Sequence, residues 1–236
     1  ITAQHSPAAD SVLQQVEIQK DYNQKIEILE ESLQQFYATR FDETIELARY
    51  GYQIAKEHND HPQMGNFLRF IGLSYGKKGN IDSASAYYYK ALPYLEESNN
   101  SKKLGLLYDD MARLYRKLRQ SKRALEFYEK ALSLYEKEND LEGIARIYNE
   151  SGVVYRDDGD YKTANERFRK SLDLQIQRKD SAGIGYALEF IGYNQLLIKD
   201  YEESEQYLKQ ALAVREKLGD DFALMLNYTA LGELYL

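Results

Sequence analysis

The chain has 236 residues, of which 31 are Lys or Arg and 38 are Asp or Glu, so its net charge is −7. This acidic balance excludes a general nucleic-acid binder, which needs a net basic surface. The chain has no Cys, which excludes disulfides, thiol catalysis and Cys-based zinc sites. No run of about 18 apolar residues is present, so the sequence predicts no membrane span. With only 3 Pro and 14 Gly, the composition favours a helix-rich protein.

The segment 1–24 differs in character from the rest of the chain. It begins with Ile, and "ITAQ" resembles the end of a signal-peptide cleavage region, which favours an exported or periplasmic protein. A cytoplasmic protein with a trimmed start is the alternative. We expect residues 1–8 to be disordered and residues 9–24 to form a lone helix that caps the remainder of the chain.

From residue 25 onward the sequence repeats with a 40-residue period, and no insertion or deletion interrupts the register. A small residue recurs at one position, a second small residue lies 12 positions later, and a large residue lies 16 positions later. The first small residues are Gly72, Ala112, Gly152, Gly192 and Gly232; the second are Ala84, Ala124, Ala164 and Ser204; the large ones are Tyr88, Tyr128, Phe168 and Leu208. This divides the chain into units 25–64, 65–104, 105–144, 145–184 and 185–224, with a partial unit 225–236.

Each unit carries two helical patterns. In residues 143–157 the apolar residues follow the i, i+3, i+4 spacing of an amphipathic helix, and residues 161–178 form a second such pattern. "DGD" at 158–160 separates them, with Gly159 suited to a left-handed helix end. Small residues let the two helices approach, and large ones fill the space beside them. Such pairs gain their core from neighbouring pairs, which predicts an α-solenoid.

The pattern resembles the tetratricopeptide repeat (TPR) family, which has small residues where Gly152, Ala164 and Ser171 stand and aromatic residues where Tyr155 and Phe168 stand. The usual TPR period is shorter, about 34 residues. The chain is therefore most similar to the long-helix arrays of signalling adaptors and bacterial sensor and regulator proteins. The family's Trp near the start of the repeat and its Pro at the end are missing here. The resemblance implies an all-α fold, a right-handed α-solenoid of antiparallel helix pairs.

The resemblance also implies a concave groove lined by the first helix of each pair. Its positions in this chain are Arg69, Asp109, Arg113, Arg116, Arg146, Asn149, Arg156, Tyr186, Glu189 and Tyr193. We expect the four arginines at 113, 116, 146 and 156 to converge and to hold carboxylates, beside tyrosines that take an apolar side chain. The predicted partner is therefore a protein or peptide, acidic, with an aromatic or aliphatic anchor. In the alternative, these arginines pair with Asp109, Asp110, Glu150 and Asp157 of the chain itself.

No set of residues indicates catalysis, a cofactor or a metal. His58 and His61 flank Asp60, and we interpret this trio as a solvated turn. The sequence thus favours a non-enzymatic scaffold that binds proteins or peptides. The alternative is the sensory or regulatory region of a larger bacterial signalling protein, such as a histidine kinase or a transcriptional regulator.

Two further stretches stand out. The basic stretch 102–123 is interpreted mainly as a solvated turn, with a docking patch for an acidic partner as the alternative. The segment 225–236 places apolar residues where no second helix follows, which predicts either further repeats or self-association through this helix. Those residues are Met225, Tyr228, Leu231, Leu234 and Tyr235.

Overall fold

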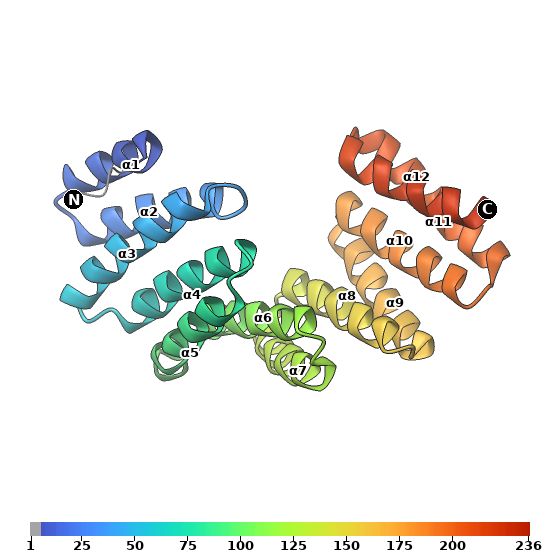
Figure 1. Ribbon diagram of the computed structural model, residues 1–236, viewed down its shortest axis with the longest axis horizontal. Helices are drawn as coiled ribbons and strands as arrows, with labels where there is room; N and C mark the ends of the chain where they lie inside the picture. The colour runs from blue at the N-terminus through green and yellow to red at the C-terminus, as the bar shows by residue number, and fades with distance from the viewer. Residues whose placement is uncertain (1–5) are drawn as a thin grey trace. The chain divides into compact units, whose positions relative to one another are not determined.

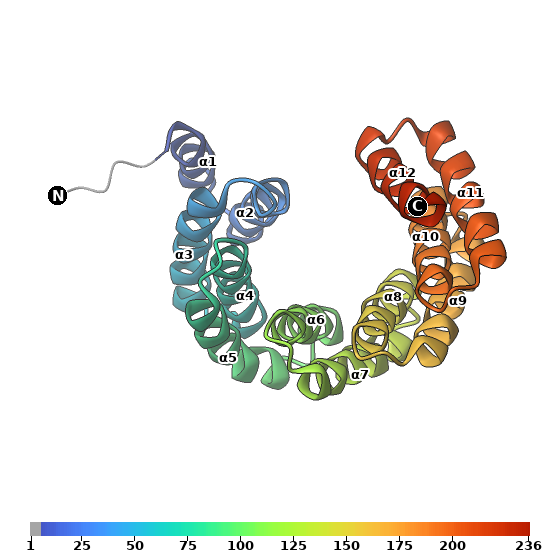
Figure 2. The same ribbon diagram turned by 45° about the vertical axis from the view of Figure 1, so that its right-hand side comes forward.

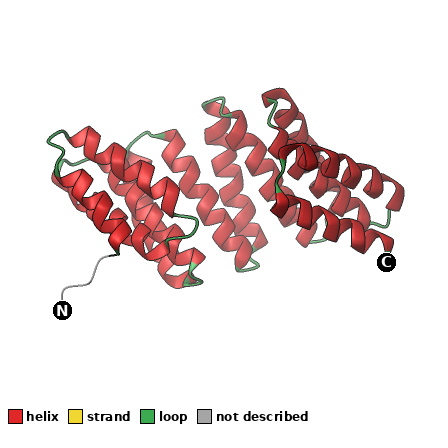
Figure 3. Ribbon diagram, turned by 90° about the horizontal axis from the view of Figure 1, so that it is seen from above, coloured by secondary structure: helices red, strands yellow, loops and turns green. Residues whose placement is uncertain are grey.

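The computed structural model describes residues 6–236, and within this range the chain forms twelve α-helices and no strand (Figures 1 and 3). Short loops join them, and consecutive helices pack in order from α1 to α5 and from α7 to α12, which confirms an all-α solenoid of helix pairs. The helices are α1 (Pro7–Glu17), α2 (Tyr22–Phe36), α3 (Phe41–Glu57), α4 (His61–Lys77), α5 (Ile81–Glu97), α6 (Ser101–Lys117), α7 (Ser121–Lys137), α8 (Leu141–Asp157), α9 (Tyr161–Arg178), α10 (Ser181–Leu197), α11 (Tyr201–Leu218) and α12 (Asp221–Tyr235).

The predicted packing between small and large residues is confirmed inside the helix pairs. A methyl group added at Gly72 of α4 would lie 2.7 Å from the ring of Tyr88 on α5. At Gly152 of α8 it would lie 2.5 Å from the ring of Phe168 on α9. Both aromatic residues are buried. Only a residue without a side chain allows these helices to approach so closely.

Side-chain caps recur with the same 40-residue period. Asp60, Asp140, Asp180 and Asp220 each accept a hydrogen bond from the backbone N–H three residues later, at the starts of α4, α8, α10 and α12. These caps satisfy N–H groups that the first helical turn leaves without an internal partner. Gly159 has a φ of 83°, which confirms the left-handed helix end predicted for it.

The chain divides into two compact units, residues 1–114 and 115–236, with the boundary inside α6. In the first unit, α2 and α4 form one layer and α1, α3 and α5 the other (Figure 2). In the second, α8, α10 and α12 form one layer and α7, α9 and α11 the other. A buried cluster of Val153, Ala164, Phe168 and Ile191 joins the two layers of the second unit.

The two ends of the chain differ in part from expectation. Helix α1 begins at Pro7 because Ser6 caps it, and the predicted helix 9–24 is interrupted because Asp21 caps α2. The prediction of disorder is therefore wrong for residues 7 and 8, and residues 1–5 lie outside the described range. On α12, Met225, Tyr228 and Tyr235 are more than half exposed, as expected. Leu231 instead packs on Leu208, and Leu234 packs against the same cluster.

Candidate functional site

The second unit gathers most of the predicted groove residues on one surface, the α8–α10 face. It comprises Arg116 from the end of α6, Asn149 and Arg156 from α8, and Tyr186, Glu189 and Tyr193 from α10. Asn149 and Arg156 are seven residues apart and so share one side of α8. The three α10 residues follow the same helical spacing.

Arg156 is the most unusual residue of this face. Its guanidinium lies 5.5 Å from the ring centre of Tyr193 and 5.9 Å from that of Phe190. Its nearest acid among the described residues is Asp157, at 3.8 Å, and none of them forms a hydrogen bond with the guanidinium. Burial lowers the pKa of Arg156, although an arginine remains charged in proteins. The face therefore carries a partly desolvated cation whose donors are available to an acceptor.

Two other residues of this face carry buried polar atoms without a hydrogen-bond partner in the part of the chain that the structure describes. These atoms are Arg116 Nε and Asn149 Oδ1. Arg116 also forms an ion pair with Glu150, with 3.1 Å between Nη2 and Oε2. Leaving a buried polar atom without a partner costs about 1–3 kcal/mol, so these two atoms destabilise the interior behind this face.

Arg215 of α11 organises the α10 side. Its side chain is 2% exposed, and it donates hydrogen bonds to Glu189 Oε2 at 2.5 Å and to the carbonyl of Ala223 at 2.8 Å. Its guanidinium lies 5.0 Å from the ring centre of Tyr186. Arg215 of the chain itself thus balances the negative charge of Glu189. Sequence reasoning missed Arg215, although the equivalent positions of other repeats hold uncharged residues: Ala55, Leu95, Tyr135 and Gln175.

Tyr193 fixes the position of Arg156 from the other side. Its hydroxyl is hydrogen-bonded to Glu233 of α12, and burial, followed by the charge of Glu233, raises the pKa of Tyr193. The ring is therefore held from α12 while the guanidinium of Arg156 lies over it. This arrangement limits the conformations that the arginine can adopt before any partner binds.

Three predicted groove residues belong to the first unit and form a different arrangement. Arg69 is 5% exposed, and its Nη1 lies 2.6 Å from Oδ2 of the buried Asp110. Arg113 Nη2 lies 2.5 Å from the other oxygen of Asp110, and Arg113 Nε lies 3.5 Å from Asp109. Two adjacent buried carboxylates need cations close by, because ions are poorly solvated inside a protein. Arg69 and the fully buried Asp109 are consequently internal, and we correct their interpretation as ligand-contacting residues.

The four arginines expected to act together thus have separate partners. The alternative of internal ion pairs is confirmed for Arg113, for Arg116 and, at the longer distance of 3.8 Å to Asp157, for Arg156. Arg146 donates a hydrogen bond to the hydroxyl of Tyr135 at 3.0 Å. Arg156 is the most weakly paired of the three that face an acid, with 3.8 Å between its Nη2 and Oδ1 of Asp157.

The two turn histidines have ordinary partners. His58 Nδ1 lies 2.9 Å from the Ile54 carbonyl, and its ring stacks on Tyr22. His61 faces Glu97 at 3.6 Å. Within residues 6–236 no three His, Asp or Glu side chains lie close enough to hold a metal ion. None of the helices described combines the length and apolar character needed to cross a membrane.

A family model described as "Tetratricopeptide repeat" matches residues 63–137, 103–177 and 143–217. The chain belongs to the tetratricopeptide repeat family. The three matches overlap, and their starts at positions 63, 103 and 143 reproduce the 40-residue period of the TPR sequence itself. Comparison with curated proteins gives no sequence match.

Solved structures share this TPR fold. BtubC from P. vanneervenii is 20% identical, with a TM-score of 0.68 over 84% of this chain and 86% of that one. The apo form of RapI is 18% identical, with a TM-score of 0.69 over 96% and 69%. Aspartyl phosphate phosphatase F from Bacillus subtilis is 15% identical, with a TM-score of 0.75 over 95% of this chain and 56% of that one. These similarities show a common fold.

Proposed function

We propose that this TPR chain is a non-catalytic scaffold that binds a protein or peptide segment on the α8–α10 face. The observation that carries the proposal is Arg156, a half-buried guanidinium without a hydrogen-bonded acid in the described chain. It lies close enough to Arg116 for the charge of Arg116 to lower its pKa further, after the larger effect of burial. A carboxylate placed between the two arginines would offset both the burial of Arg156 and the repulsion between the two positive charges.

A peptide supplies the group that Arg156 lacks, a carboxylate at hydrogen-bond distance. An acidic side chain or a terminal carboxylate fits Arg156, since arginine binds carboxylates with two parallel hydrogen bonds. The rings of Phe190 and Tyr193 lie beside the guanidinium and offer contacts to an apolar anchor.

Selection from a displayed library of random peptides tests this proposal. The whole chain is the bait, and we expect enriched peptides to combine Asp, Glu or a free C-terminus with an aromatic or aliphatic residue. Arg156→Gln should lose binding about tenfold, because a hydrogen bond to a charged group contributes roughly 1.5–3 kcal/mol. Arg123→Gln removes the same charge from the exposed side of α7 and should leave binding unchanged. Equal loss in both variants would implicate the basic stretch 102–123 instead.

A regulatory role is the second candidate, and two structural neighbours favour it. One is a signal-transduction ATPase with a tetratricopeptide repeat sensor from Pyrococcus horikoshii, of which this chain spans 38%, with a TM-score of 0.67 and 18% identity. The other is a Rap protein complexed with Competence and Sporulation Factor. If the chain is a sensor, a selected peptide should change hydrogen exchange in helices away from the α8–α10 face. Protection confined to α8 and α10 would favour a passive scaffold.

Self-association through α12 is a separate part of the proposal. Phe222, Met225, Tyr228 and Tyr235 are all more than half exposed on this helix. Apolar side chains gathered on one exposed helix commonly mark an interaction surface. Sedimentation equilibrium should give a mass that rises with concentration, and Met225→Glu should abolish that rise. Because Leu231 is buried against Leu208, substitution at Leu231 would test folding rather than association.

A further inference from the structure

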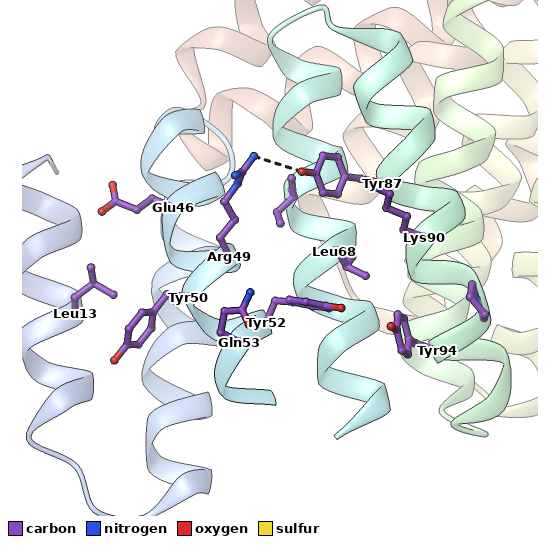
Figure 4. A pocket seen from close by; sticks show the side chains of 12 residues that line it. Leu13, Glu46, Arg49, Tyr50, Tyr52, Gln53, Leu68, Tyr87, Lys90 and Tyr94 are labelled. Atoms are coloured by element: carbon purple, nitrogen blue, oxygen red, sulfur yellow. Dashed lines mark hydrogen bonds between the residues drawn. The ribbon is translucent and has the colours of Figure 1, made fainter. Parts of the chain in front are cut away.

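The first unit contains a pocket that the peptide-binding proposal does not use. It has a volume of about 900 Å³ and lies between α3 and α5, with α4 beneath it and α1 at one edge (Figure 4). This size is within the range of small-molecule sites, which are mostly apolar with a few polar groups that fix orientation. The pocket belongs to the layer of second helices, whereas the α8–α10 face is formed mainly by first helices.

The sequence of this repeat departs from the others at the pocket wall. Tyr52 stands where the following repeats have Leu92, Leu132, Leu172 and Leu212, and Tyr94 stands where they have Leu134, Leu174 and Val214. Both tyrosines line the pocket, and they lie close enough for Tyr94 to raise the pKa of Tyr52. A pair of hydroxyls at positions that otherwise hold aliphatic residues is unnecessary for solenoid packing, so it indicates another role.

On the equivalent surfaces of the second unit, arginine side chains form hydrogen bonds and ion pairs between adjacent second helices. Arg167 of α9 reaches Glu129 of α7 at 2.8 Å, and these two residues occupy the repeat positions of Tyr87 and Arg49. Between α9 and α11, Arg169 bonds both Tyr207 and Glu203. Among the described residues, Arg49 of the pocket forms only long hydrogen bonds, 3.3 Å to the hydroxyl of Tyr87 and 3.4 Å to that of Tyr75. Within the described chain no carboxylate lies within ion-pair distance of Arg49.

The pocket is polarised along its length. Arg49 and Tyr87 lie at one end in Figure 4, and Tyr52 and Tyr94 lie toward the other. Lys90 adds a second cation at the Arg49 end, 5.1 Å from the ring centre of Tyr87. Leu68 and Ile71 of α4 are apolar lining residues. The lining thus offers positive charge at one end, an apolar floor, and aromatic walls with a hydroxyl pair at the far end.

We propose that this pocket binds a small amphipathic anion, a molecule with an aromatic or aliphatic body and one negatively charged group. The charged group lies against Arg49 and Lys90, which supply hydrogen bonds and opposite charge. The body covers Leu68 and Ile71 and stacks on the tyrosine rings. Glu46, on the α1 side of the pocket, disfavours a second negative charge there.

Two fluorescent probes of almost the same shape test the charge requirement. Anilinonaphthalene sulfonate has an aromatic body and one sulfonate, and phenylnaphthylamine has the same rings without the charge. Titrated into the whole chain, the sulfonate probe should saturate at one site. Arg49→Gln should weaken its binding about tenfold, the change expected for one lost charge-assisted hydrogen bond, and should leave the uncharged probe unaffected. Arg169→Gln, the matched arginine of α9, should alter neither probe.

A second pair of variants locates the probe. Substituting both tyrosines, Tyr52→Leu with Tyr94→Leu, restores the residue type of the other repeats, so helicity should be retained while both probes bind roughly fivefold more weakly, from lost aromatic contacts. Met225→Glu alters the exposed face of α12 and should change nothing. If Met225→Glu abolishes probe binding, or if Arg49→Gln and Arg169→Gln behave alike, the pocket is not the site and the proposal is wrong.

Discussion

Adding one methyl group at two glycines of α4 should change the stability of the chain in opposite directions. Gly72 and Gly76 lie one helical turn apart on the same side of the helix, toward α5. A methyl at Gly72 would lie 2.7 Å from the ring of Tyr88 and 3.2 Å from the carbonyl of Ala84. A methyl at Gly76 would meet nothing closer than 3.5 Å, which is ordinary van der Waals contact.

The size of each effect follows from two terms. Alanine is favoured over glycine inside a helix by about 1 kcal/mol, and this gain applies to both substitutions. At Gly72 overpacking opposes it, at a typical cost of about 1–3 kcal/mol, because Tyr88 is 3% exposed and has little room to move. Gly72→Ala should therefore lower the free energy of unfolding by on the order of 1 kcal/mol. Gly76→Ala should raise it by about 0.5 kcal/mol.

Urea unfolding followed by circular dichroism measures both changes. The midpoint should fall for Gly72→Ala and rise for Gly76→Ala, with the slope of the transition unchanged for both. If Gly72→Ala proved as stable as Gly76→Ala, the recurring glycine would reflect something other than close helix approach, and the packing explanation of the 40-residue pattern would be refuted.

Three further predictions concern buried charges, helix caps and pH. Asp110→Asn should lower the free energy of unfolding by about 3 kcal/mol because it leaves the buried Arg69 without its charged partner. The control is Lys78→Ala, which removes an exposed ion pair with Asp42 and should lower the free energy of unfolding by less than about 1 kcal/mol in the same urea assay. Asp60→Ala should lower the free energy of unfolding by about 2 kcal/mol and Asp140→Ala by about 1 kcal/mol. The difference arises because Asp60 accepts a 2.7 Å hydrogen bond from Tyr22 in addition to capping α4, whereas Asp140 only caps α8. Equal losses would show that the hydrogen bond from Tyr22 contributes nothing to stability. The ordinary pKa of a tyrosine is 10.0, and two tyrosines of the chain have a pKa raised to about 12. The main cause is the hydrogen bond with Tyr94 for Tyr52 and burial for Tyr108. The folded state thus holds these protons more tightly than the unfolded state, so the urea midpoint should fall as the pH rises from 10 to 12, and the fall should be smaller when both tyrosines are replaced by Phe.

Repetition makes the fold predictable from sequence, because the same spacing of small and large residues recurs in each repeat. The offset between Gly152 and Phe168 is short and recurs in successive repeats, so a helix pair and its stacking follow from one pattern. The recurring Asp60 and Asp140 are recognisable as turn residues, and their role as helix caps is the same local chemistry. Errors arise at the start of the chain, where no repeat supports the assignment.

The candidate site is less predictable because the exposure of a polar side chain depends on residues distant in the sequence. Arg69 stands at a groove position of its helix, yet Asp110, 41 residues later, draws it into the interior. Arg215 lies on α11, the second helix of its pair, outside the predicted groove positions. Its role can be recognised only from its contacts with Glu189 and Tyr186 in the structure. Arg156 is predicted as a groove residue by the resemblance to the TPR family, but its lack of a hydrogen-bonded acid can be seen only in three dimensions.

The central claim is that Arg156 holds a carboxylate of a bound peptide, and a double-mutant cycle tests it most directly. Calorimetry would measure the affinity of a selected acidic peptide and its carboxamide analogue for the parent chain and for Arg156→Gln. We predict a coupling energy of at least about 1 kcal/mol between the carboxylate and Arg156, with near-zero coupling to Arg123. Additive effects of the two changes at Arg156, within about 0.3 kcal/mol, would mean that the peptide binds elsewhere and would contradict the proposed function.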